Sequence, residues 1–218
     1  MRDSAPSPAK PRPRGRPRLA PDAQASRKAL LRAGLAQLTE RGYVAVRLDD
    51  IVAAAGVTKG AFYHHFSSKA DYGAVLIAEY DAFFRARIAQ SLERADLPPL
   101  ERLRDFTEMA EAGMARFDFR RGCLIGNLGQ EMGALPETYR AKLIAVFEGW
   151  QGMTATCLRA AQAAGEIDVN QDPDALAALF WTGWEGAVLR AKLERNPAPL
   201  RQFSAGFLRL ISKQRSSP

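Results

Sequence analysis

The chain has 218 residues, of which 47% are hydrophobic, and this is enough for one large or two modest domains with a buried core. No run of eighteen apolar residues occurs, which excludes a transmembrane helix, and the N-terminus lacks the apolar region of a secretory signal. The two cysteines, Cys123 and Cys157, suit neither a disulfide framework nor a metal site. We therefore expect a cytoplasmic protein that uses no metal or other cofactor and has no contact with a membrane.

The net charge of +7 is distributed unevenly along the chain. Residues 1–69 contain 13 Lys and Arg against 5 Asp and Glu, a balance of +8, whereas residues 70–218 contain 18 against 19, a balance of −1. All of the excess positive charge thus lies in the first third of the chain. Such a balance is typical of a nucleic-acid-binding domain joined to a domain with another role.

Residues 1–22 contain six prolines and show no apolar periodicity, which predicts a disordered basic arm. Within the run PRPRGRPR, arginines alternate with proline and glycine, and this pattern resembles the core of an AT-hook. An extended backbone of this kind lies along a narrow minor groove and places Arg14, Arg16 and Arg18 against its negative potential. A basic solubilising tail is the alternative.

Residues 26–42 predict a first helix with a leucine face, closed by Gly42. Residues 48–55 then repeat apolar side chains at helical spacing, and Gly56 follows, a residue that turns sharply at little steric penalty. Thr58 is a good N-cap for a short second helix over residues 59–65. This arrangement predicts a helix-turn-helix, in which the start of the second helix enters the major groove of DNA.

The run from Asp49 to Lys69 resembles the N-terminal domain of TetR-type transcriptional repressors, whose pattern is D-x-I-x-x-x-A-G-V-x-K-G-x-F-Y-x-x-F-x-x-K. The resemblance implies that Thr58, Lys59, Gly60 and Ala61 approach bases, and that further side chains hold phosphates. Phe62 and Phe66 are expected to pack inside the domain. The residues that we expect to contact DNA are Arg14, Arg16, Arg18, Arg47, Thr58, Lys59, Gly60, Ala61, Tyr63, His64 and Lys69.

The rest of the chain, residues 70–218, predicts a second helical domain for ligand binding and dimerisation, after a DNA-binding domain over residues 23–69. Helices are expected over 69–95, from Pro98 or Pro99 to about 115, and over 137–165, 173–195 and 199–213. No alternation typical of strands occurs. The predicted fold class is therefore all-α.

A glycine-rich run, RRGCLIGNLGQEMGALP, spans residues 120–136 and is where we expect a ligand. Four glycines spaced three or four apart would share one face of a helix, and polar side chains would lie in apolar surroundings. Such side chains need partners when buried, and either a ligand or a neighbouring helix would supply them. The residues that we expect to line the site are Arg120, Arg121, Asn127, Gln130, Trp184 and Glu185.

Large and small side chains alternate in the penultimate predicted helix, around Phe180, Trp181 and Trp184, and face a last helix with Phe203 and Phe207. This composition suits a helical dimer interface, with packing inside one chain as the alternative. A helix-turn-helix of this kind binds paired half-sites, which favours the homodimer. A polar pair between Glu185 and Arg190 is a further expectation.

The run from Arg120 to Pro136, together with FWTGWEGAVLRAKLE, is similar to acrylate-responsive repressors of the same family. This resemblance implies that a small carboxylate or its CoA thioester, such as acrylate or acryloyl-CoA, is the inducer. We expect a repressor that binds a pseudo-palindromic operator in double-stranded DNA as a dimer and is released by that small molecule.

Two other functions follow from particular residues or their absence. Cys123 would sense thiol-reactive compounds if the flanking Arg120 and Arg121 lowered its pKa. An enzyme is disfavoured because the sequence shows no Ser/His/Asp set, phosphate loop or metal cluster.

Overall fold

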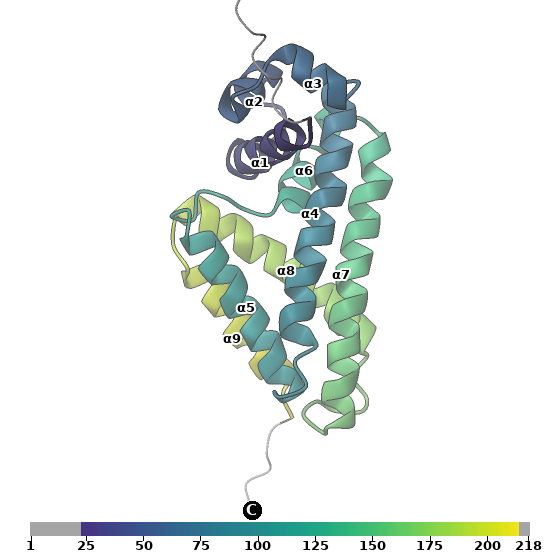
Figure 1. The fold of residues 1–218 in the computed structure, drawn as a ribbon. Helices are drawn as coiled ribbons and strands as arrows, with labels where there is room; N and C mark the ends of the chain where they lie inside the picture. Colours follow the sequence, from purple (N-terminus) through teal and green to yellow (C-terminus); the bar gives the residue numbers. More distant parts are fainter. Residues whose placement is uncertain (1–22, 214–218) are drawn as a thin grey trace, which may run out of the picture.

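The computed structural model describes residues 23–213, and this part of the chain is almost entirely helical (Figure 1). One isolated bridge joins Ile167 and Ser212. The helices are α1 Ala23–Arg41, α2 Leu48–Ala55, α3 Lys59–His65, α4 Lys69–Leu92, α5 Pro99–Ala115, α6 Leu124–Gln130, a 3-10 turn Met132–Ala134, α7 Thr138–Ala163, α8 Pro173–Glu194 and α9 Ala198–Ile211. The predicted all-α class is confirmed.

Helices α1, α2 and α3 form a helix-turn-helix unit at one end of the molecule (Figure 1). Gly56 ends α2 with a φ of 66°, in the left-handed region that favours glycine. Thr58 caps α3 by accepting a hydrogen bond from the backbone N–H of Ala61 at 3.1 Å. Phe62 and Phe66 are buried beneath α3. The turn, the cap and the buried face of this unit agree with the prediction.

The first turns of α4 fasten the helix-turn-helix to the rest of the protein. Tyr72 of α4 is buried against α1, and its hydroxyl donates to the carbonyl oxygen of Leu30 at 2.6 Å. Gly34 of α1 makes room for this ring, since a Cβ there would lie 1.9 Å from the Tyr72 hydroxyl oxygen. Beyond this contact α4 runs alongside α7 (Figure 1), so one helix belongs to both parts of the molecule.

The core of the C-terminal part is aromatic. Phe84, Phe106, Trp150, Trp181 and Trp184 lie within ring-contact distance of one another, and the three tryptophans are almost completely buried. The prediction that the rings of α8 form a dimer interface is therefore wrong. They fill the interior of their own chain because the helices around them supply enough apolar surface to bury them.

Within residues 23–213, no helix is both long and apolar enough to cross a membrane.

Candidate functional site

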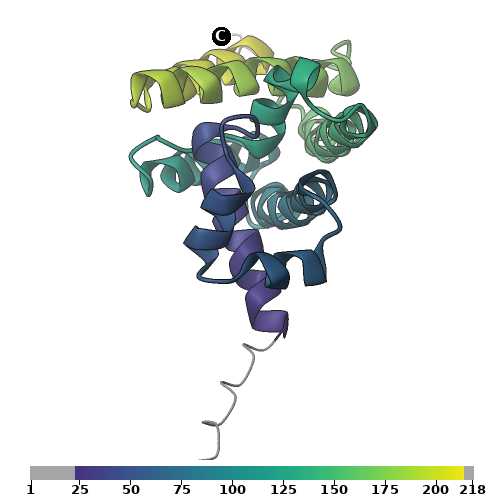
Figure 2. The same cartoon turned by 90° about the horizontal axis from the view of Figure 1, so that it is seen from above.

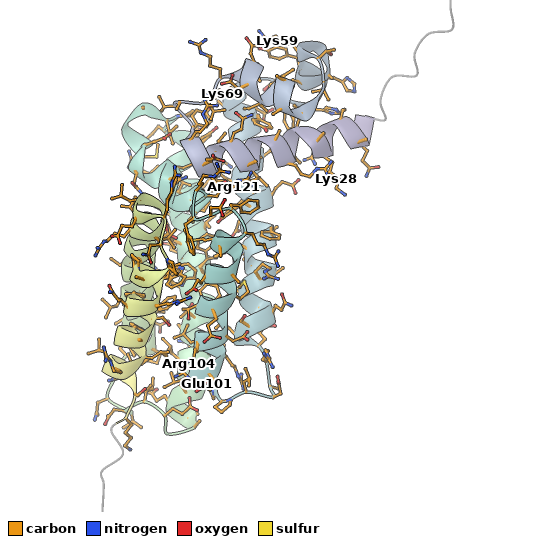
Figure 3. The ribbon with its side chains drawn as sticks, turned by 90° about the vertical axis from the view of Figure 1, so that its left-hand side faces the viewer. Lys28, Lys59, Lys69, Glu101, Arg104 and Arg121 are labelled. Carbon is orange, nitrogen blue, oxygen red and sulfur yellow. The ribbon has the colours of Figure 1, made fainter. Side chains whose placement is uncertain are left out.

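Helix α3 presents a polar face to solvent at the end of the molecule. Lys59, Tyr63 and His64 are exposed, and the side chain of Lys59 points away from the body of the protein (Figure 3). A Cβ on Gly60 would meet only the Thr58 hydroxyl, at 3.7 Å, so the start of α3 is open to close approach by another molecule.

The charged side chains around this surface are exposed and only weakly paired. Lys59 Nζ lies 2.7 Å from Asp49 Oδ1, and the pKa of Lys59 is raised by this hydrogen bond and by the charge of Asp49. Both side chains are more than half exposed, so the ion pair between Lys59 and Asp49 is weak. Arg47 is also exposed and stands at the N-cap of α2, where its backbone N–H donates to Asp50 Oδ2 at 3.2 Å. The two cations flank the same helix pair.

Lys69 differs from the expectation that its ammonium reaches a phosphate. Its Nζ donates to the carbonyl oxygens of Tyr43 at 2.8 Å and Val46 at 2.6 Å, and it lies 4.2 Å from the centre of the Tyr43 ring. Burial lowers the pKa of Lys69, and the charge of Glu131 partly offsets this effect. Figure 3 shows Lys69 where the helix-turn-helix meets the rest of the protein. Its hydrogen bonds hold the α1–α2 connection instead of leaving the ammonium free.

The expected minor-groove residues Arg14, Arg16 and Arg18 lie outside the residues that the structure describes.

Two polar side chains from the middle of the glycine-rich run bind the helix-turn-helix. Glu131 Oε2 accepts hydrogen bonds from the backbone N–H groups of Tyr43 at 2.8 Å and Val44 at 3.0 Å. Asn127 Nδ2 donates to the carbonyl oxygens of Leu38 and Thr39 at the end of α1, at 3.1 and 3.0 Å. The two residues satisfy backbone groups that the end of α1 leaves unpaired. We refer to Asn127 and Glu131 as the α6 clasp.

Gly42 is essential to this contact. Its φ of 83° favours glycine, and a Cβ there would lie 1.9 Å from Glu131 Oε1. From the sequence, either a ligand or a neighbouring helix could be the partner of these polar groups. For Asn127 and Glu131 the partner is α1 and the turn that follows it, so the amide donors of Asn127 are already engaged.

The expectation that four glycines share one helical face is wrong. Helix α6 covers only Leu124–Gln130, and a 3-10 turn follows over Met132–Ala134. A Cβ on Gly126 would be 2.0 Å from Glu185 Oε2 of α8, and one on Gly122 would be 3.3 Å from Lys192 Cδ, whereas Gly129 and Gly133 face open space. Glu131, between α6 and this turn, reaches the α1–α2 connection.

Only three of the six expected ligand residues meet at one cavity. Asn127, Gln130 and Glu185 line a small cavity of about 10 Å³ between α6 and α8. This volume is about that of one water probe, so the site is essentially closed in this conformation. Cys123, expected as a thiol sensor, and Gly126 of the glycine-rich run also line this cavity, together with Lys192, which the prediction missed. Lys192 was recognisable, since it lies seven residues, or two turns, beyond Glu185 on the same helix.

The other three expected ligand residues lie elsewhere. Arg121 Nε is 3.7 Å from Glu40 Oε2, and its guanidinium stacks 3.9 Å above the centre of the Phe117 ring (Figure 3). Arg120 is exposed, and Trp184 is buried in the aromatic core. The predicted pair of Glu185 with Arg190 is also wrong, because Arg190 Nη2 pairs with Glu194 at 2.6 Å.

The groups around the cavity have unusual proton affinities. Burial raises the pKa of Glu185 to about 7, while its hydrogen bond with Cys123 acts in the opposite direction. Burial and the charge of Glu185 raise the pKa of the Cys123 thiol well above its usual range. The expectation that Arg120 and Arg121 lower the pKa of Cys123 is therefore wrong. Burial lowers the pKa of Lys192, which is the cation closest to this lining.

A larger open groove of about 610 Å³ lies between α5 and α9, at the end of the molecule where Figure 3 labels Glu101 and Arg104. Thr107 and Ser204 bond to each other through their hydroxyls in this groove, at 2.8 Å. None of the residues expected to hold a ligand lines it.

Helices α8 and α9 lie together along one side of the molecule (Figure 2). Their outward surface keeps large apolar side chains exposed, among them Leu193 at 78% and Leu210 at 65%. On α8 the exposed positions recur every three or four residues as Leu179, Thr182, Gly186, Leu189 and Leu193. This spacing produces a continuous stripe that a second helix can cover.

Comparison with known proteins agrees with both parts of the molecule. The model described as "Bacterial regulatory proteins, tetR family" matches residues 30–71, and "Tetracyclin repressor-like, C-terminal domain" matches residues 99–207. The chain is 58% identical to the transcriptional regulator AcuR of Cereibacter sphaeroides, over 95% of this chain and 94% of that protein. It is 37% identical to the transcriptional repressor DhaR of a Mycobacterium species, over 81% of this chain and 87% of that protein.

A solved structure supports the same assignment. The regulatory protein TetR from Rhodobacter sphaeroides superposes with a TM-score of 0.84 at 56% sequence identity, over 85% of this chain and 98% of that one. The similarity covers the helix-turn-helix and the C-terminal helices together. The chain therefore belongs to the TetR family of bacterial transcriptional regulators, which are DNA-binding proteins rather than enzymes.

Proposed function

We propose that this protein is a homodimeric repressor that binds a pseudo-palindromic operator through α3 and is released by a small carboxylate. The observation that carries the proposal is the open polar start of α3. The Thr58 hydroxyl caps the helix by accepting from the backbone N–H of Ala61, and Gly60 leaves space for DNA to approach the backbone closely. Thr58, Lys59, Gly60 and Ala61 would face base edges, while Arg47, Tyr63 and His64 would contact phosphates.

The dimer would form through the exposed stripe of α8 together with α9. A helix-turn-helix reads two half-sites about one DNA turn apart only when a partner supplies the second recognition helix. Apolar side chains such as Leu189 and Leu193 would lose their contact with water on association. The stripe lies outside the aromatic core, so dimerisation would require no repacking of that core.

The inducer would enter between α6 and α8. Lys192 supplies a cation for a carboxylate, and Asn127, Gln130 and Glu185 add polar groups around it. The resemblance of the 120–136 run to acrylate-responsive repressors suggests acrylate or acryloyl-CoA. The small cavity favours the free acid, because a CoA thioester would require a much larger opening.

Release would follow from a shift of α6. The α6 clasp holds the end of α1 and the turn after it, so any ligand that displaces α6 disturbs the position of the helix-turn-helix. Ligand binding and operator binding would then favour different conformations of one dimer, which is the requirement for allosteric release.

Fluorescence-anisotropy titration of the operator tests the DNA-binding part of the proposal. Lys59→Ala should weaken operator binding on the order of tenfold and relax the sequence preference at the base pair that Lys59 faces. Lys142→Ala is the matched control, since Lys142 is an exposed lysine on α7. Equal affinities for the two variants would reject α3 as the recognition helix.

Titration of the protein–operator complex with acrylate tests the inducer. Acrylate should release the DNA, and Lys192→Met should weaken this response more than it weakens operator binding. Release that is identical in Lys192→Met would reject this lysine as the carboxylate partner.

A second candidate function is sensing of thiol-reactive compounds through Cys123. The observation that favours it is the position of Cys123 in the cavity lining, next to a carboxyl group with a raised pKa. Cys123→Ser decides between the two modes, since a sensor that acts through this thiol loses its response, whereas a noncovalent site keeps it.

A further inference from the structure

Cys123 and Glu185 belong to a cluster that joins three helices, in which Cys123 is buried and Glu185 is partly exposed. The Cys123 thiol is 8% exposed and donates a hydrogen bond to the Glu185 carboxylate of α8. The Tyr80 hydroxyl of α4 donates to the sulfur of Cys123, and the backbone N–H of Gly126 approaches it at 3.5 Å. The sulfur thus has one group that can accept its proton and two donors that would stabilise a thiolate.

The second cysteine of the chain lacks this arrangement. Cys157 is buried and donates to the carbonyl oxygen of Pro99 at 3.3 Å, and burial raises its pKa to about 11. A backbone carbonyl cannot take up a proton at neutral pH. The contrast between two buried thiols in one chain indicates a specific role for the carboxyl group beside Cys123.

The charges that face Glu185 are few. Cys123 contacts it from the start of α6, Tyr80 of α4 is affected by its charge, and Lys192 shares its cavity from α8 itself. Lys192 responds chiefly to burial and then to the charges of Glu131 and Glu40. Arg121 is engaged by Glu40 and Phe117. Glu185 is therefore the proton acceptor that the Cys123 thiol contacts.

We propose that this cluster is a modification site for small α,β-unsaturated carbonyl compounds, in which Glu185 is the base that activates Cys123. The inference rests on the thiol-sensing alternative of the proposed function. The carboxylate takes the thiol proton while the sulfur bonds to the β-carbon of the alkene. The alkene electron pair moves toward the carbonyl group as an enolate. The proton on Glu185 then passes to the α-carbon, which leaves a thioether and restores the carboxylate.

The same geometry explains how an adduct would affect DNA binding. Cys123 is the N-cap of α6, and the cavity beside it has a volume of only about 10 Å³. A three-carbon substituent on the sulfur exceeds this space, so α6 must move. Because α6 leads into the α6 clasp, addition at Cys123 would loosen the end of α1 and the turn that positions α2 and α3.

The experiment uses the full-length protein and acrylamide, a neutral electron-poor alkene, with saturated propionamide as the matched control compound. Adduct formation is followed by intact-protein mass spectrometry, and operator release by fluorescence anisotropy. The wild type and Cys157→Ser should each gain one adduct and release DNA, whereas Cys123→Ser should gain none. Glu185→Gln should slow the addition by about a hundredfold, the usual contribution of a general base.

The pH dependence provides a measurement that needs no variant. Glu185 accepts a proton only when it is ionised, so the wild-type rate should rise with pH and level off above about 7. In Glu185→Gln the rate should keep rising as the thiol itself ionises. If Glu185→Gln does not fold, the pH dependence of the wild-type addition rate tests the role of Glu185 by itself.

An equal rate in Glu185→Gln, an adduct on Cys157, or a wild-type profile without a bend near pH 7 would overturn the inference. Release of the operator by propionate as well as acrylate, without any adduct, would also overturn it. That last result would leave the noncovalent repressor intact, so failure of this inference is distinguishable from failure of the proposed function.

Discussion

Replacement of Glu131 by alanine tests how firmly the α6 clasp holds the helix-turn-helix. The carboxylate accepts from the backbone N–H groups of Tyr43 and Val44 at 2.8 and 3.0 Å. A hydrogen bond to a charged group contributes about 1.5 to 3 kcal/mol, and the exposed Val44 can replace its bond with water. We therefore expect Glu131→Ala to lower the free energy of unfolding by about 2 to 3 kcal/mol.

The measurement is urea unfolding at one fixed protein concentration, because the stability of the proposed dimer would depend on concentration. Glu148→Ala is the control, since Glu148 is exposed on α7 and surface substitutions usually change stability by no more than about 0.5 kcal/mol. Operator affinity should also fall in Glu131→Ala, because the turn before α2 loses its anchor. A free energy of unfolding for Glu131→Ala equal to that of Glu148→Ala, together with wild-type operator affinity, would refute this role of Glu131.

Three further predictions concern single side chains. Lys69→Met should lower the free energy of unfolding by about 2 kcal/mol, because two carbonyl oxygens lose a charged donor, and should leave the salt dependence of operator binding unchanged. A smaller salt slope with normal stability would instead make Lys69 a phosphate contact. For Glu185 the native pKa of about 7 exceeds its ordinary value of 4.5, so the native state binds more protons between these values and stability falls as pH rises from about 4.5 to 7. Denaturant titrations should show a loss of up to about 3 kcal/mol in the wild type relative to Glu185→Gln across that range, and parallel curves would contradict the raised pKa. Leu193→Glu should weaken dimerisation by at least about tenfold in analytical ultracentrifugation, since a charge would enter the apolar stripe of α8, and an unchanged dimer would place the interface elsewhere.

Local chemistry explains why the helix-turn-helix could be predicted residue by residue. Gly56 and Thr58 act on the backbone within a few positions of themselves, and Phe62 lies four residues before Phe66, the C-cap of the same helix. These signals depend on neighbours in sequence, which any reader of the chain can see. The TetR-type pattern spans the same residues, so it agrees with the turn and the cap because both depend on these local residues.

The ligand region was harder to predict because its partners are distant in sequence. The amide of Asn127 reaches Leu38 and Thr39, and the carboxylate of Glu131 reaches Tyr43, nearly ninety residues away. Composition showed that polar groups in this run require partners, but it could not say whether a ligand or α1 supplies them. The same limit applies to Lys69, whose ammonium finds carbonyl oxygens more than twenty residues earlier.

The sequence by itself determined the helical class, the order of the helices, and the turn and cap that shape the DNA-binding unit, because periodicity, glycine and capping residues act locally. Only the tertiary structure decided which apolar and polar groups face each other. In the structure Trp184 is buried in its own chain, and the ammonium of Lys69 donates to the α1–α2 turn instead of reaching a phosphate. Cys123 lies against Glu185 and Tyr80. The physical reason is that burial and charge pairing depend on which helix faces arrive at one place, and a linear pattern does not encode that choice position by position.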